Sequence, residues 1–370
     1  MYLKQLSLSQ YKNYQQQELM FCEKLNSFVG NNGSGKTNLL DAIHYLSFCK
    51  GFINPIDSQN IMHEKDFFAI HGEFSVKGSA TDKVSCIQKL NHKKVFKLNQ
   101  KEYDRLADHI GLFPMVLISP SDSNLIHKGS DERRKYIDSV ISQFDALYLD
   151  NLINYNKALF QRNALLRSFS EKRYFDLHSL EIWNEQLIIY AEKIWEKRKD
   201  FILHFIEHFN HYFSIISSSK ETVKLEYLSQ LHDDSLSNLL HTGLQKDRNF
   251  QFTNFGIHKD DFDFLIDGFP LKKFGSQGQQ KSFVIALKLA QFEYTRKIKG
   301  FKPLLLFDDI FDKLDNLRVE QLIKLVGENG FGQVFISDTH LQRMQELFQK
   351  TGIQHKIFMI ESGTASEVEL

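Results

Sequence analysis

Nine consecutive residues near the start of the chain have the types and spacing needed to hold a triphosphate. The run Gly30-Asn31-Asn32-Gly33-Ser34-Gly35-Lys36-Thr37-Asn38 fills every fixed position of the pattern G-x-x-x-x-G-K-[ST]. The glycines let backbone N–H groups curve around an anion, Lys36 can reach the β- and γ-phosphates, and the Thr37 hydroxyl can complete a Mg²⁺ shell. The sequence therefore predicts a nucleoside triphosphate site.

The segments on either side of this loop have patterns that would position it. Leu25–Val29 is a short apolar run typical of a strand, and Asn38–Leu46 has helical spacing. A helix that begins at the loop would direct the positive end of its dipole at the phosphates. The alternative is a chance glycine-rich turn, which would need neither the strand before it nor the helix after it.

Two adjacent carboxylates lie far along the chain, directly after another apolar run. Leu304–Phe307 predicts a buried strand, and Asp308 and Asp309 follow it. In phosphate-loop ATPases an acid at this strand tip holds Mg²⁺, and the next acid can orient or deprotonate the attacking water. We assign Asp308 to the metal and Asp309 to the water, as catalytic residues together with Lys36. A solvated turn after a strand is the alternative.

The separation of these two motifs indicates an inserted domain. Lys36 and Asp308 are 272 residues apart, whereas a compact kinase or GTPase would rarely place ~100 or more residues between them. This is the architecture of ABC-type ATPases. The predicted fold class is therefore α/β, with an ABC-type P-loop ATPase head, an antiparallel β lobe and an inserted α-helical hairpin domain.

The periodicity of apolar residues locates these parts. Three short alternating segments between Phe68 and Leu98 predict the antiparallel sheet. Helical spacing from Asp131 to about Phe169, and again from Leu180 to Tyr212, predicts two long helices in a hairpin. The expected division is a head of residues 1–118 and 252–370 and an inserted domain of residues 119–251.

A second anion-binding element is predicted before the acid strand. The signature segment, Gly275-Ser276-Gln277-Gly278-Gln279, precedes a helical pattern over Ser282–Lys299. ABC-type ATPases work in pairs, and each protomer presents such a helix N-terminus to the γ-phosphate bound by the other. Ser276 would supply a hydroxyl, Gly278 would allow close backbone approach, and the helix dipole would favour the anion. We include Ser276, Gly278 and Gln279 in the nucleotide site, although the same segment alone is also an ordinary helix cap.

Two further segments follow in the order expected of such a head. Asp312-Lys313-Leu314-Asp315 has the spacing of a loop that contacts the partner protomer. His340 follows the predicted strand Val334–Ile336, where a γ-phosphate sensor would lie. A surface histidine is an equal alternative for His340.

The composition restricts where the protein acts and what it contacts. With 46 basic and 46 acidic residues the formal net charge is zero, so a nucleic-acid surface would have to be a local patch. The three cysteines are widely spaced and odd in number, which fits a reducing cytoplasm. The sequence has no apolar run of ~18 residues and no export signal, so we expect a cytoplasmic protein without a membrane span.

Together these motifs resemble the RecF family of SMC-like ABC ATPases nearly from end to end. The phosphate loop and the acids are general to the superfamily. The segments that select the family are Ser119–Asp122, Gly129–Arg134 with Asp138, Gln161–Leu166, Gly256–Asp261 and Gly275–Gln279. Three features depart from the pattern: Ile257 replaces a usual Pro, Lys259 replaces a usual Arg, and Lys50–Asn54 lacks a common Arg.

The resemblance implies a weakly hydrolysing ATPase that uses ATP and Mg²⁺ and forms an ATP-dependent homodimer with the nucleotide held between two heads. It implies binding to DNA at gaps or single-strand/double-strand junctions. With RecO- and RecR-like partners the protein would support RecA loading, DNA replication, repair of DNA damage and the SOS response. Slow hydrolysis would reset the clamp.

The sequence does not identify the residues that face DNA. Arg133-Arg134-Lys135 begins a predicted helix, where the dipole slightly disfavours cations, so an anionic partner and a solvated helix start are both open interpretations. Further basic residues that could contact DNA are Lys93, Lys94, Arg162, Arg167, Lys172 and Arg173. Because the net charge is zero, we expect DNA affinity to need the dimer and to fall steeply with salt.

The sequence also contains a short motif that is found in some zinc peptidases. His204-Phe205-Ile206-Glu207-His208 matches the H-x-x-E-H pattern of one class of zinc peptidases. It lies inside the second predicted long helix among phenylalanines, and no acidic third ligand is evident. We interpret it as part of a helix face.

Three other functional classes share the phosphate loop. The ATPase subunit of a transporter would carry Leu-Ser-Gly-Gly-Gln as its signature, and an SMC-like nuclease relative would carry an added acidic metal-binding domain. A scaffold that binds ATP without turnover is the third class. The presence of Lys36, Thr37, Asp308 and Asp309 favours hydrolysis over that scaffold.

Overall fold

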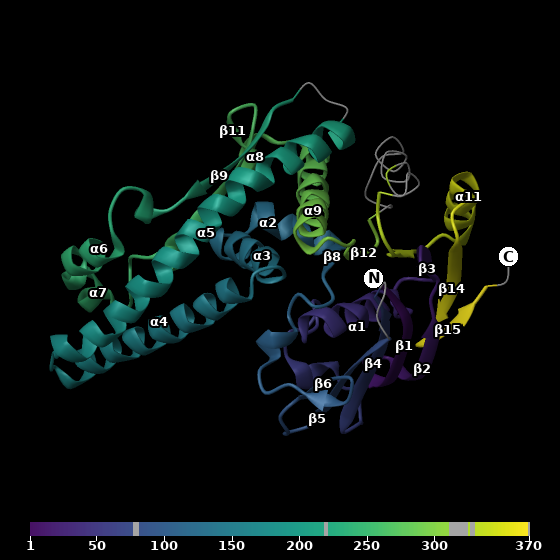
Figure 1. Ribbon diagram of the computed structural model, residues 1–370, viewed down its shortest axis with the longest axis horizontal. Coiled ribbons are helices and arrows are strands. Elements are labelled where there is room, and N and C mark those ends of the chain that lie inside the picture. Colours follow the sequence, from purple (N-terminus) through teal and green to yellow (C-terminus); the bar gives the residue numbers. More distant parts are fainter. Residues whose placement is uncertain (77–80, 218–220, 311–324, 326–329, 369–370) are drawn as a thin grey trace. The chain divides into compact units, whose positions relative to one another are not determined.

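The chain divides into two compact units (Figure 1). The computed structural model describes residues 1–76, 81–217, 221–310, 325 and 330–368. Unit 1 comprises Met1–Asp122, Tyr212–Ser218 and Lys281–Leu370, and unit 2 comprises Ser123–His211 and Ser219–Gln280. This division differs from the predicted one chiefly at its second boundary, which lies after Gln280 instead of residue 251. The physical reason is strand pairing, because β10 (Asp261–Ile266) pairs with β9 (Val223–Leu228) inside unit 2.

Unit 1 contains an antiparallel sheet of six strands, in the order β2-β1-β4-β5-β6-β7. Its members are β1 (Tyr2–Tyr11), β2 (Tyr14–Met20), β4 (Phe67–Ser75), β5 (Asp82–Lys89), β6 (Val95–Leu98) and β7 (Lys101–Glu102). The alternation predicted around Phe68 is present, since Phe68, Ile70 and Phe74 are buried. This sheet is the antiparallel lobe that the sequence predicted.

The second sheet of unit 1 is mostly parallel and has the strand order β15-β14-β3-β13-β12-β8. Its members are β3 (Leu25–Val29), β8 (Met115–Ile118), β12 (Leu304–Phe307), β13 (Val334–Asp338), β14 (His355–Glu361) and β15 (Thr364–Glu367). β3, β12 and β13 are buried along their whole length, as is typical of parallel strands covered on both faces. Because parallel strands end at the same edge, the residues after β3 and β12 meet there.

Helix α1 (Lys36–Phe48) joins the two sheets of unit 1 into one core. Leu39 and Ile43 of α1 pack in the same buried cluster as Leu6 of the antiparallel sheet and Phe28 and Phe335 of the parallel sheet. This packing fixes the direction of α1, and with it the direction in which the phosphate loop opens. Two other helices, α9 (Gln277–Lys299) and α11 (Leu341–Thr351), follow later in the chain.

Unit 2 is mainly helical. Its helices are α2 (Asn124–His127), α3 (Ser130–Ser142), α4 (Ala146–Lys172), α5 (Leu177–Ser217, of which residues up to His211 belong to unit 2), α6 (Leu236–Thr242), α7 (Leu244–Phe250) and α8 (Leu271–Phe274). α4 and α5 form the predicted antiparallel hairpin (Figure 1). A single helix from Asp131 to Phe169 was a wrong prediction. The chain breaks between α3 and α4 because Asp145 leaves helical geometry and its side chain caps α4 by accepting a hydrogen bond from the Tyr148 N–H.

Smaller elements complete both units. β9 and β10 form a three-stranded antiparallel sheet with β11 (Phe269–Pro270). The 3₁₀ turns are η1 (Asp57–Asn60), η2 (Leu106–His109), η3 (Pro120–Ser123), η4 (Gln230–His232) and η5 (Ile257–Lys259). Across the part of the chain that the structure describes, we find no helix with the length and apolar character that a membrane span requires.

Candidate nucleotide site

The predicted phosphate loop connects β3 to α1, as its pattern requires. Gly33 and Gly35 have φ values of 80° and 120°, which side chains rarely adopt, so the loop needs glycine at both positions. A Cβ on Gly30 would overlap the carbonyl oxygen of Ile360. The backbone of the loop therefore depends on these three glycines.

Lys36 lies at the first position of α1 and is only 3% exposed. Its Nζ donates hydrogen bonds to the carbonyl oxygens of Gly30, at 2.9 Å, and Asn31, at 3.1 Å. Among the described residues no carboxylate lies within ion-pair distance of this ammonium group. A buried cation held only by neutral carbonyls favours an anionic ligand beside it.

Thr37 and Asp308 meet at the edge of the parallel sheet. The Thr37 hydroxyl donates to Asp308 Oδ1 at 2.9 Å, and the Ser337 hydroxyl donates to the same oxygen at 2.8 Å. Thr37 comes from α1, Asp308 follows β12, and Ser337 lies in β13. The structure thus brings together the two predicted Mg²⁺ ligands, although 271 residues separate them.

The surroundings of Asp308 disfavour the ionised form of its carboxyl group. The residue is 5% exposed, and burial raises the pKa of its carboxyl group above the ordinary value. The hydroxyls of Ser337 and Thr37 act against this shift, and the charge of Asp309 adds to it. A divalent cation bound beside Asp308 would remove this penalty, because it stabilises the ionised form.

Asp309 is placed by the same serine. Its N–H donates to Ser337 Oγ at 2.9 Å, and Ser337 Oγ lies 3.3 Å from Asp309 Oδ1. Asp309 has a positive φ of 43°, a backbone conformation uncommon for a residue with a side chain. The Ser337 hydroxyl therefore contacts both consecutive carboxylates, Asp308 and Asp309.

The turn between β1 and β2 supports the phosphate loop, a role that the sequence did not reveal. Asn13 Nδ2 donates to the Ser34 carbonyl oxygen at 2.9 Å, and the Tyr14 hydroxyl donates to the Gly35 carbonyl oxygen at 3.1 Å. Asn38 Nδ2, one residue past Thr37, donates to Asn13 Oδ1 at 2.7 Å. No local pattern reveals this role, because the contacts join residues 21 and 25 positions apart in the chain.

A buried ion pair next to this turn anchors α1. Lys12 Nζ forms an ion pair with Asp41, which is fully buried and also accepts a hydrogen bond from the Tyr11 hydroxyl at 2.6 Å. The N–H groups of Phe52 and Ile53 donate to the other oxygen of Asp41, at 2.5 and 3.2 Å. The Lys50–Asn54 segment is therefore held to α1 through Asp41 without the arginine that the family usually has there.

The signature segment lies in unit 2, at the start of α9. Ser276 is exposed, its N–H donates to Gln279 Oε1 at 2.6 Å, and its hydroxyl accepts from the Gln279 N–H at 3.2 Å. This is a capping box, in which the two residues satisfy each other's backbone donors. Gln279 also donates to Glu221 at 2.6 Å, and Gly278 is partly exposed. Ser276 is thus accessible on the surface of its own unit.

Two predicted segments of the head remain, Asp312–Asp315 and His340. The Asp312–Asp315 segment lies outside the described residues. His340 is exposed and caps α11, and its backbone N–H donates to Asp338 Oδ1 at 2.7 Å, while Arg343 pairs with Oδ2 of the same carboxylate at 3.2 Å. A role of His340 as a phosphate sensor remains a prediction.

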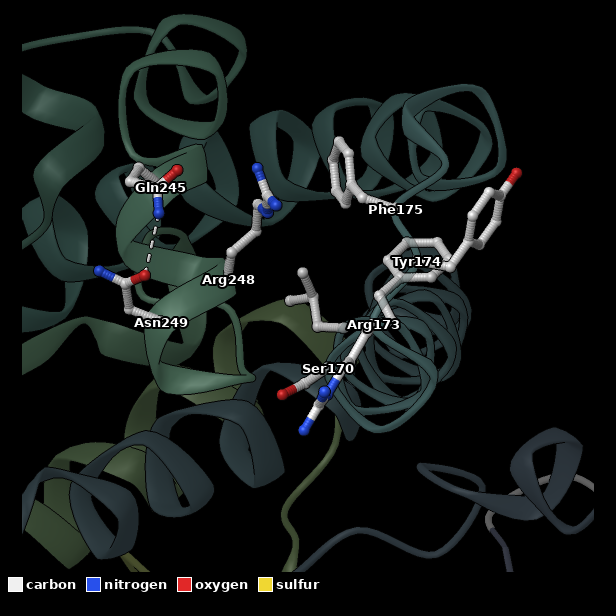
Figure 2. Close-up of a pocket in the computed structure, with 9 residues that line it drawn as sticks. Ser170, Arg173, Tyr174, Phe175, Gln245, Arg248 and Asn249 are labelled. Carbon is white, nitrogen blue, oxygen red and sulfur yellow. Dashed lines mark hydrogen bonds between the residues drawn. The ribbon is translucent and has the colours of Figure 1, made fainter.

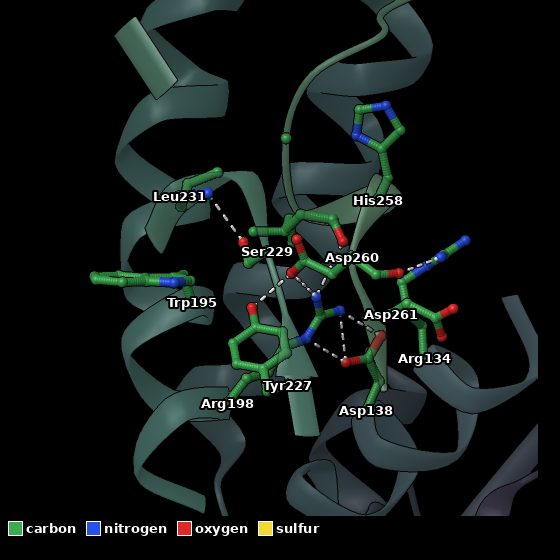
Figure 3. Close-up of polar contacts among 12 residues, drawn as sticks. Arg134, Asp138, Trp195, Arg198, Tyr227, Ser229, Leu231, His258, Asp260 and Asp261 are labelled. Carbon is green, nitrogen blue, oxygen red and sulfur yellow. Dashed lines mark hydrogen bonds and ion pairs between the residues drawn. The ribbon is translucent and has the colours of Figure 1, made fainter. Parts of the chain in front are cut away.

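Two arginines of the family-selecting segment Gly129–Arg134 have partners inside unit 2, and Figure 3 shows Arg134 beside the contacts of Arg198. Arg133 forms a two-pronged contact with Asp261, at 2.7 and 2.9 Å, and Arg134 donates to the Asp260 carbonyl oxygen at 2.6 Å. The buried Arg198 donates to both Asp138, at 2.9 Å, and Asp260, at 2.7 Å. Arg133 therefore has an anionic partner inside the protein, Asp261, whereas Arg134 is held by a neutral carbonyl oxygen.

A second buried arginine has the same kind of role. Arg162 is 0% exposed and pairs with Asp247 at 2.7 Å, so this basic residue does not lie on the surface of its unit. Lys94 is likewise paired, with Asp57 at 2.8 Å. The remaining basic candidates are exposed: Lys93, Arg167, Lys172 and Arg173.

The H-x-x-E-H motif lies on α5, as predicted. His204 is exposed, and its Nδ1 lies 2.9 Å from the Asp200 carbonyl oxygen of the preceding helical turn. Within the described ranges no group of three or more His, Cys, Asp or Glu side chains is arranged to hold a metal ion. A Mg²⁺ ion at the nucleotide site would therefore depend on Thr37, Asp308 and the phosphates together.

Comparison with known proteins supplies the wider context for this geometry. The family model described as RecF/RecN/SMC N terminal domain matches residues 2–365. The chain is 51% identical over 358 residues to the DNA replication and repair protein RecF of Flavobacterium johnsoniae, covering 97% of this chain and 99% of that one. It is 48% identical to the RecF protein of Bacteroides fragilis over 369 residues, covering 100% and 99% of the two chains. The chain belongs to the RecF family.

Solved structures agree with this assignment. A structure of the recombination mediator protein RecF with ATP, in the RecFOR pathway, has a TM-score of 0.90 and 30% identity and covers 100% of this chain and 98% of that one. The Smc head domain of Pyrococcus furiosus has a TM-score of 0.59 at 18% identity, which supports the ABC-type head fold alone. The predicted fold and family are confirmed, and with them a function in DNA replication and repair. The transporter and nuclease alternatives lose their basis.

Proposed function

We propose that this chain is an ATP-dependent DNA-binding protein of recombinational repair, acting in the cytoplasm as a nucleotide-switched clamp. ATP binding drives two heads together on gapped or junction DNA, and slow hydrolysis separates them. With RecO- and RecR-like partners the clamp supports RecA loading and the SOS response. The homologous RecF structure with ATP, in the RecFOR pathway, is the comparison that supports this proposal.

One observation carries the nucleotide half of the proposal. Thr37 and Asp308 share a hydrogen bond of 2.9 Å, directly beside a phosphate loop whose lysine has only carbonyl partners. Ser34 Oγ, inside the loop, is buried and has no hydrogen-bond partner in the described part of the chain. Buried polar groups usually have partners, so this set fits an anionic ligand with a cation.

The residues that would hold Mg²⁺-ATP follow from this geometry. The loop from Gly30 to Asn38 would surround the phosphates, with Lys36 next to the β- and γ-phosphates. Thr37 and Asp308 would hold Mg²⁺, which supplies charge neutralisation at the phosphoryl group that is transferred. Asp309 would accept a hydrogen bond from the attacking water and take its proton.

The switch requires a second copy of the chain. Ser276 lies on the surface of unit 2, and its capping box leaves the hydroxyl oxygen as an acceptor and donor at the first turn of α9. In the proposed dimer, Ser276, Gly278 and Gln279 of one protomer approach the γ-phosphate held by Lys36 of the other. The helix dipole of α9 would then favour the phosphate charge.

An Asp309→Asn variant tests the switch. The amide keeps the size of the side chain but cannot take a proton, so we expect ATP-driven dimers that form and do not dissociate. Sedimentation with and without ATP, together with the rate of phosphate release, measures both effects. If the variant hydrolyses ATP at the wild-type rate, Asp309 does not have the proposed role.

DNA binding is tested by titration with salt. We expect ATP to strengthen binding to gapped DNA more than to plain duplex or single strands, with a steep decrease as salt rises. Fluorescence anisotropy with the three DNA forms, with and without ATP, measures this. Equal binding to all three, independent of ATP, would reject the clamp.

A further inference from the structure

A pocket of about 290 Å³ lies in unit 2, where the turn after α4 meets α7 (Figure 2). Its wall combines aromatic rings, arginines and amides, among them Phe169, Arg173, Tyr174, Phe175, Gln245 and Arg248. A cavity of ~150 Å³ is enough for a benzene-sized ring. The pocket therefore has room for one heterocyclic base, and it plays no part in the nucleotide site described above.

The two arginines of this pocket differ from Arg133, Arg162 and Arg198 of the same unit. Arg173 and Arg248 are exposed, and within the described residues neither forms an ion pair with a carboxylate. Arg133, Arg162 and Arg198, in contrast, all pair with aspartates. These two arginines line one pocket from different elements, and each guanidinium group can pair with an anion such as a phosphate.

The aromatic side chains offer flat surfaces beside these charges. Tyr174 is 62% exposed, and its ring centroid lies 6.3 Å from that of Phe169, which in turn lies 5.4 Å from that of Phe175. The Arg248 guanidinium carbon lies 4.2 Å from the Phe175 centroid. In Figure 2, Gln245 and Arg248 on α7 lie across the pocket from the turn that carries Arg173 and Tyr174.

We propose that this pocket, the hairpin-tip pocket, binds one nucleotide unit of single-stranded DNA. The base stacks on Tyr174, the neighbouring phosphates pair with Arg173 and Arg248, and Gln245 is within reach of the base edge. Stacking on exposed rings next to cations is the usual way in which proteins hold single strands. The proposal rests on the DNA-binding function above and adds to it a contact for the unpaired strand of a gap.

The chemistry selects a single strand over a duplex. Bases in a duplex are stacked on each other, so their faces are not available to Tyr174. An acidic peptide with a phenylalanine could also use the arginines and rings, but a phenyl ring has no polar edge for the amide of Gln245. A peptide is therefore the competing outcome of the test.

The test measures binding of a fluorescent oligo-dT to the full chain across a salt series. We expect Arg173→Ala and Arg248→Ala each to weaken single-strand binding roughly five- to twentyfold and to reduce the salt slope by about one. Tyr174→Ala should weaken binding to a similar extent with an unchanged salt slope, because it removes stacking and no charge. Tyr174→Phe keeps the ring and should stay near the wild type.

A charge-matched control separates the pocket from general electrostatics. Lys193→Ala removes one exposed positive charge from α5 outside the pocket and should change binding less than twofold. Binding to plain duplex should be nearly unaffected by Tyr174→Ala. All four altered side chains are exposed, and a thermal unfolding scan checks that each variant folds.

The outcomes distinguish this inference from the proposed function. If the wild type binds gapped DNA with ATP but the pocket variants bind oligo-dT normally, the inference is overturned and the clamp is retained; a wild type that binds no DNA overturns both. If thymidine monophosphate saturates the pocket as tightly as oligo-dT, the site takes free nucleotides and not a strand. If an acidic phenylalanine-containing peptide binds in an Arg248-dependent manner and oligo-dT does not, it is a peptide site.

Discussion

The nucleotide site of unit 1 and the polar core of unit 2 use buried charges in opposite ways. In unit 2, Arg198 lies between Asp138 and Asp260, and each charge has an opposite charge within 2.9 Å. In the nucleotide site, the described part of the chain gives Lys36 carbonyl partners alone and gives Asp308 hydrogen bonds from hydroxyls alone. The charges of the unit 2 core are thus balanced by its own residues. Those of the nucleotide site are left to be balanced by a ligand.

This difference shows which charged residues serve the scaffold. A buried ion pair does not add much stability compared with apolar residues, but removing one partner leaves a strongly unfavourable charge. The family-selecting Arg133 and Arg162 therefore join elements of unit 2 through Asp261 and Asp247. The residues with unbalanced charge, Lys36 and Asp308, are the ones whose motifs predicted chemistry.

The largest expected effect comes from removing the unbalanced cation. Lys36→Met should abolish ATP binding and ATP-driven dimerisation, because no other cation is placed within the loop. The unfolding temperature without nucleotide should change little. Sedimentation with ATP and nucleotide titration measure the loss, and Lys65→Met, an exposed lysine of the same unit, is the control. ATP-driven dimers of Lys36→Met would remove the basis for the comparison.

Breaking the balanced pair should act on stability instead. Arg198→Met leaves the buried Asp260 and the partly buried Asp138 without their cation, which should lower the free energy of unfolding by about 3–5 kcal/mol. Urea denaturation measures this. Lys193→Met, an exposed position on the same helix, should cost less than ~0.5 kcal/mol. A similar small loss for Arg198→Met would mean that the network carries little of the stability of unit 2.

A third prediction concerns the stability of unit 1 in acid, which depends on a histidine that is buried in its neutral form. His109 is fully buried, and burial lowers its pKa to about 4 from 6.5. Its folded pKa lies below the unfolded one, so the unfolded chain takes up a proton first and stability is lost as pH falls from about 6.5 to about 4. This loss is on the order of 2–3 kcal/mol.

A His109→Gln variant should flatten this pH dependence, since glutamine cannot take the proton but can still donate to the Leu46 carbonyl oxygen, which lies 2.7 Å from His109 Nε2. Unfolding curves between pH 7 and pH 4.5 measure the slope. The exposed His92→Gln should leave it unchanged. Equal slopes for all three proteins would assign the acid sensitivity to other groups.

The smallest expected effect is a change in stability when the charge of Asp308 is removed. Burial raises the pKa of Asp308, so its ionised form at neutral pH opposes folding. Asp308→Asn keeps an oxygen that can accept from Thr37 and Ser337 and should therefore stabilise the nucleotide-free protein slightly while removing hydrolysis. Thermal unfolding at pH 7 without Mg²⁺ measures the gain. A loss of stability would show that the charge of Asp308 is already balanced.

The sequence predicted those parts of the site that depend on local residue types. The loop from Gly30 to Asn38, its strand and helix, and the acids after Leu304–Phe307 each carry their signal within a few residues. Ser337 and Asn13 were missed because their role depends on contacts with residues 29 and 21 positions away, which no local pattern encodes.

The same limit explains the errors in unit 2. Arg162 looks like any surface cation until the fold brings it to Asp247, 85 residues further along the chain. The helix break at Asp145 interrupts an apolar periodicity that continues on both sides, so periodicity alone joined α3 to α4. Charge and period are local properties, whereas the partner of a buried charge is a property of the fold.

The position of β3 in its sheet has a consequence for how the protein is made. Both neighbours of β3, β13 and β14, come from residues after 330, and Gly363 donates its N–H to the Ser34 carbonyl oxygen. On the ribosome, the apolar segment Leu25–Val29 must therefore wait for most of the polypeptide before it gains strand partners. A nascent chain that ends before β13 and β14 lacks both strand partners of β3, so the phosphate loop after β3 is unsupported. The apolar segment then stays exposed, as in the substrates that chaperones bind.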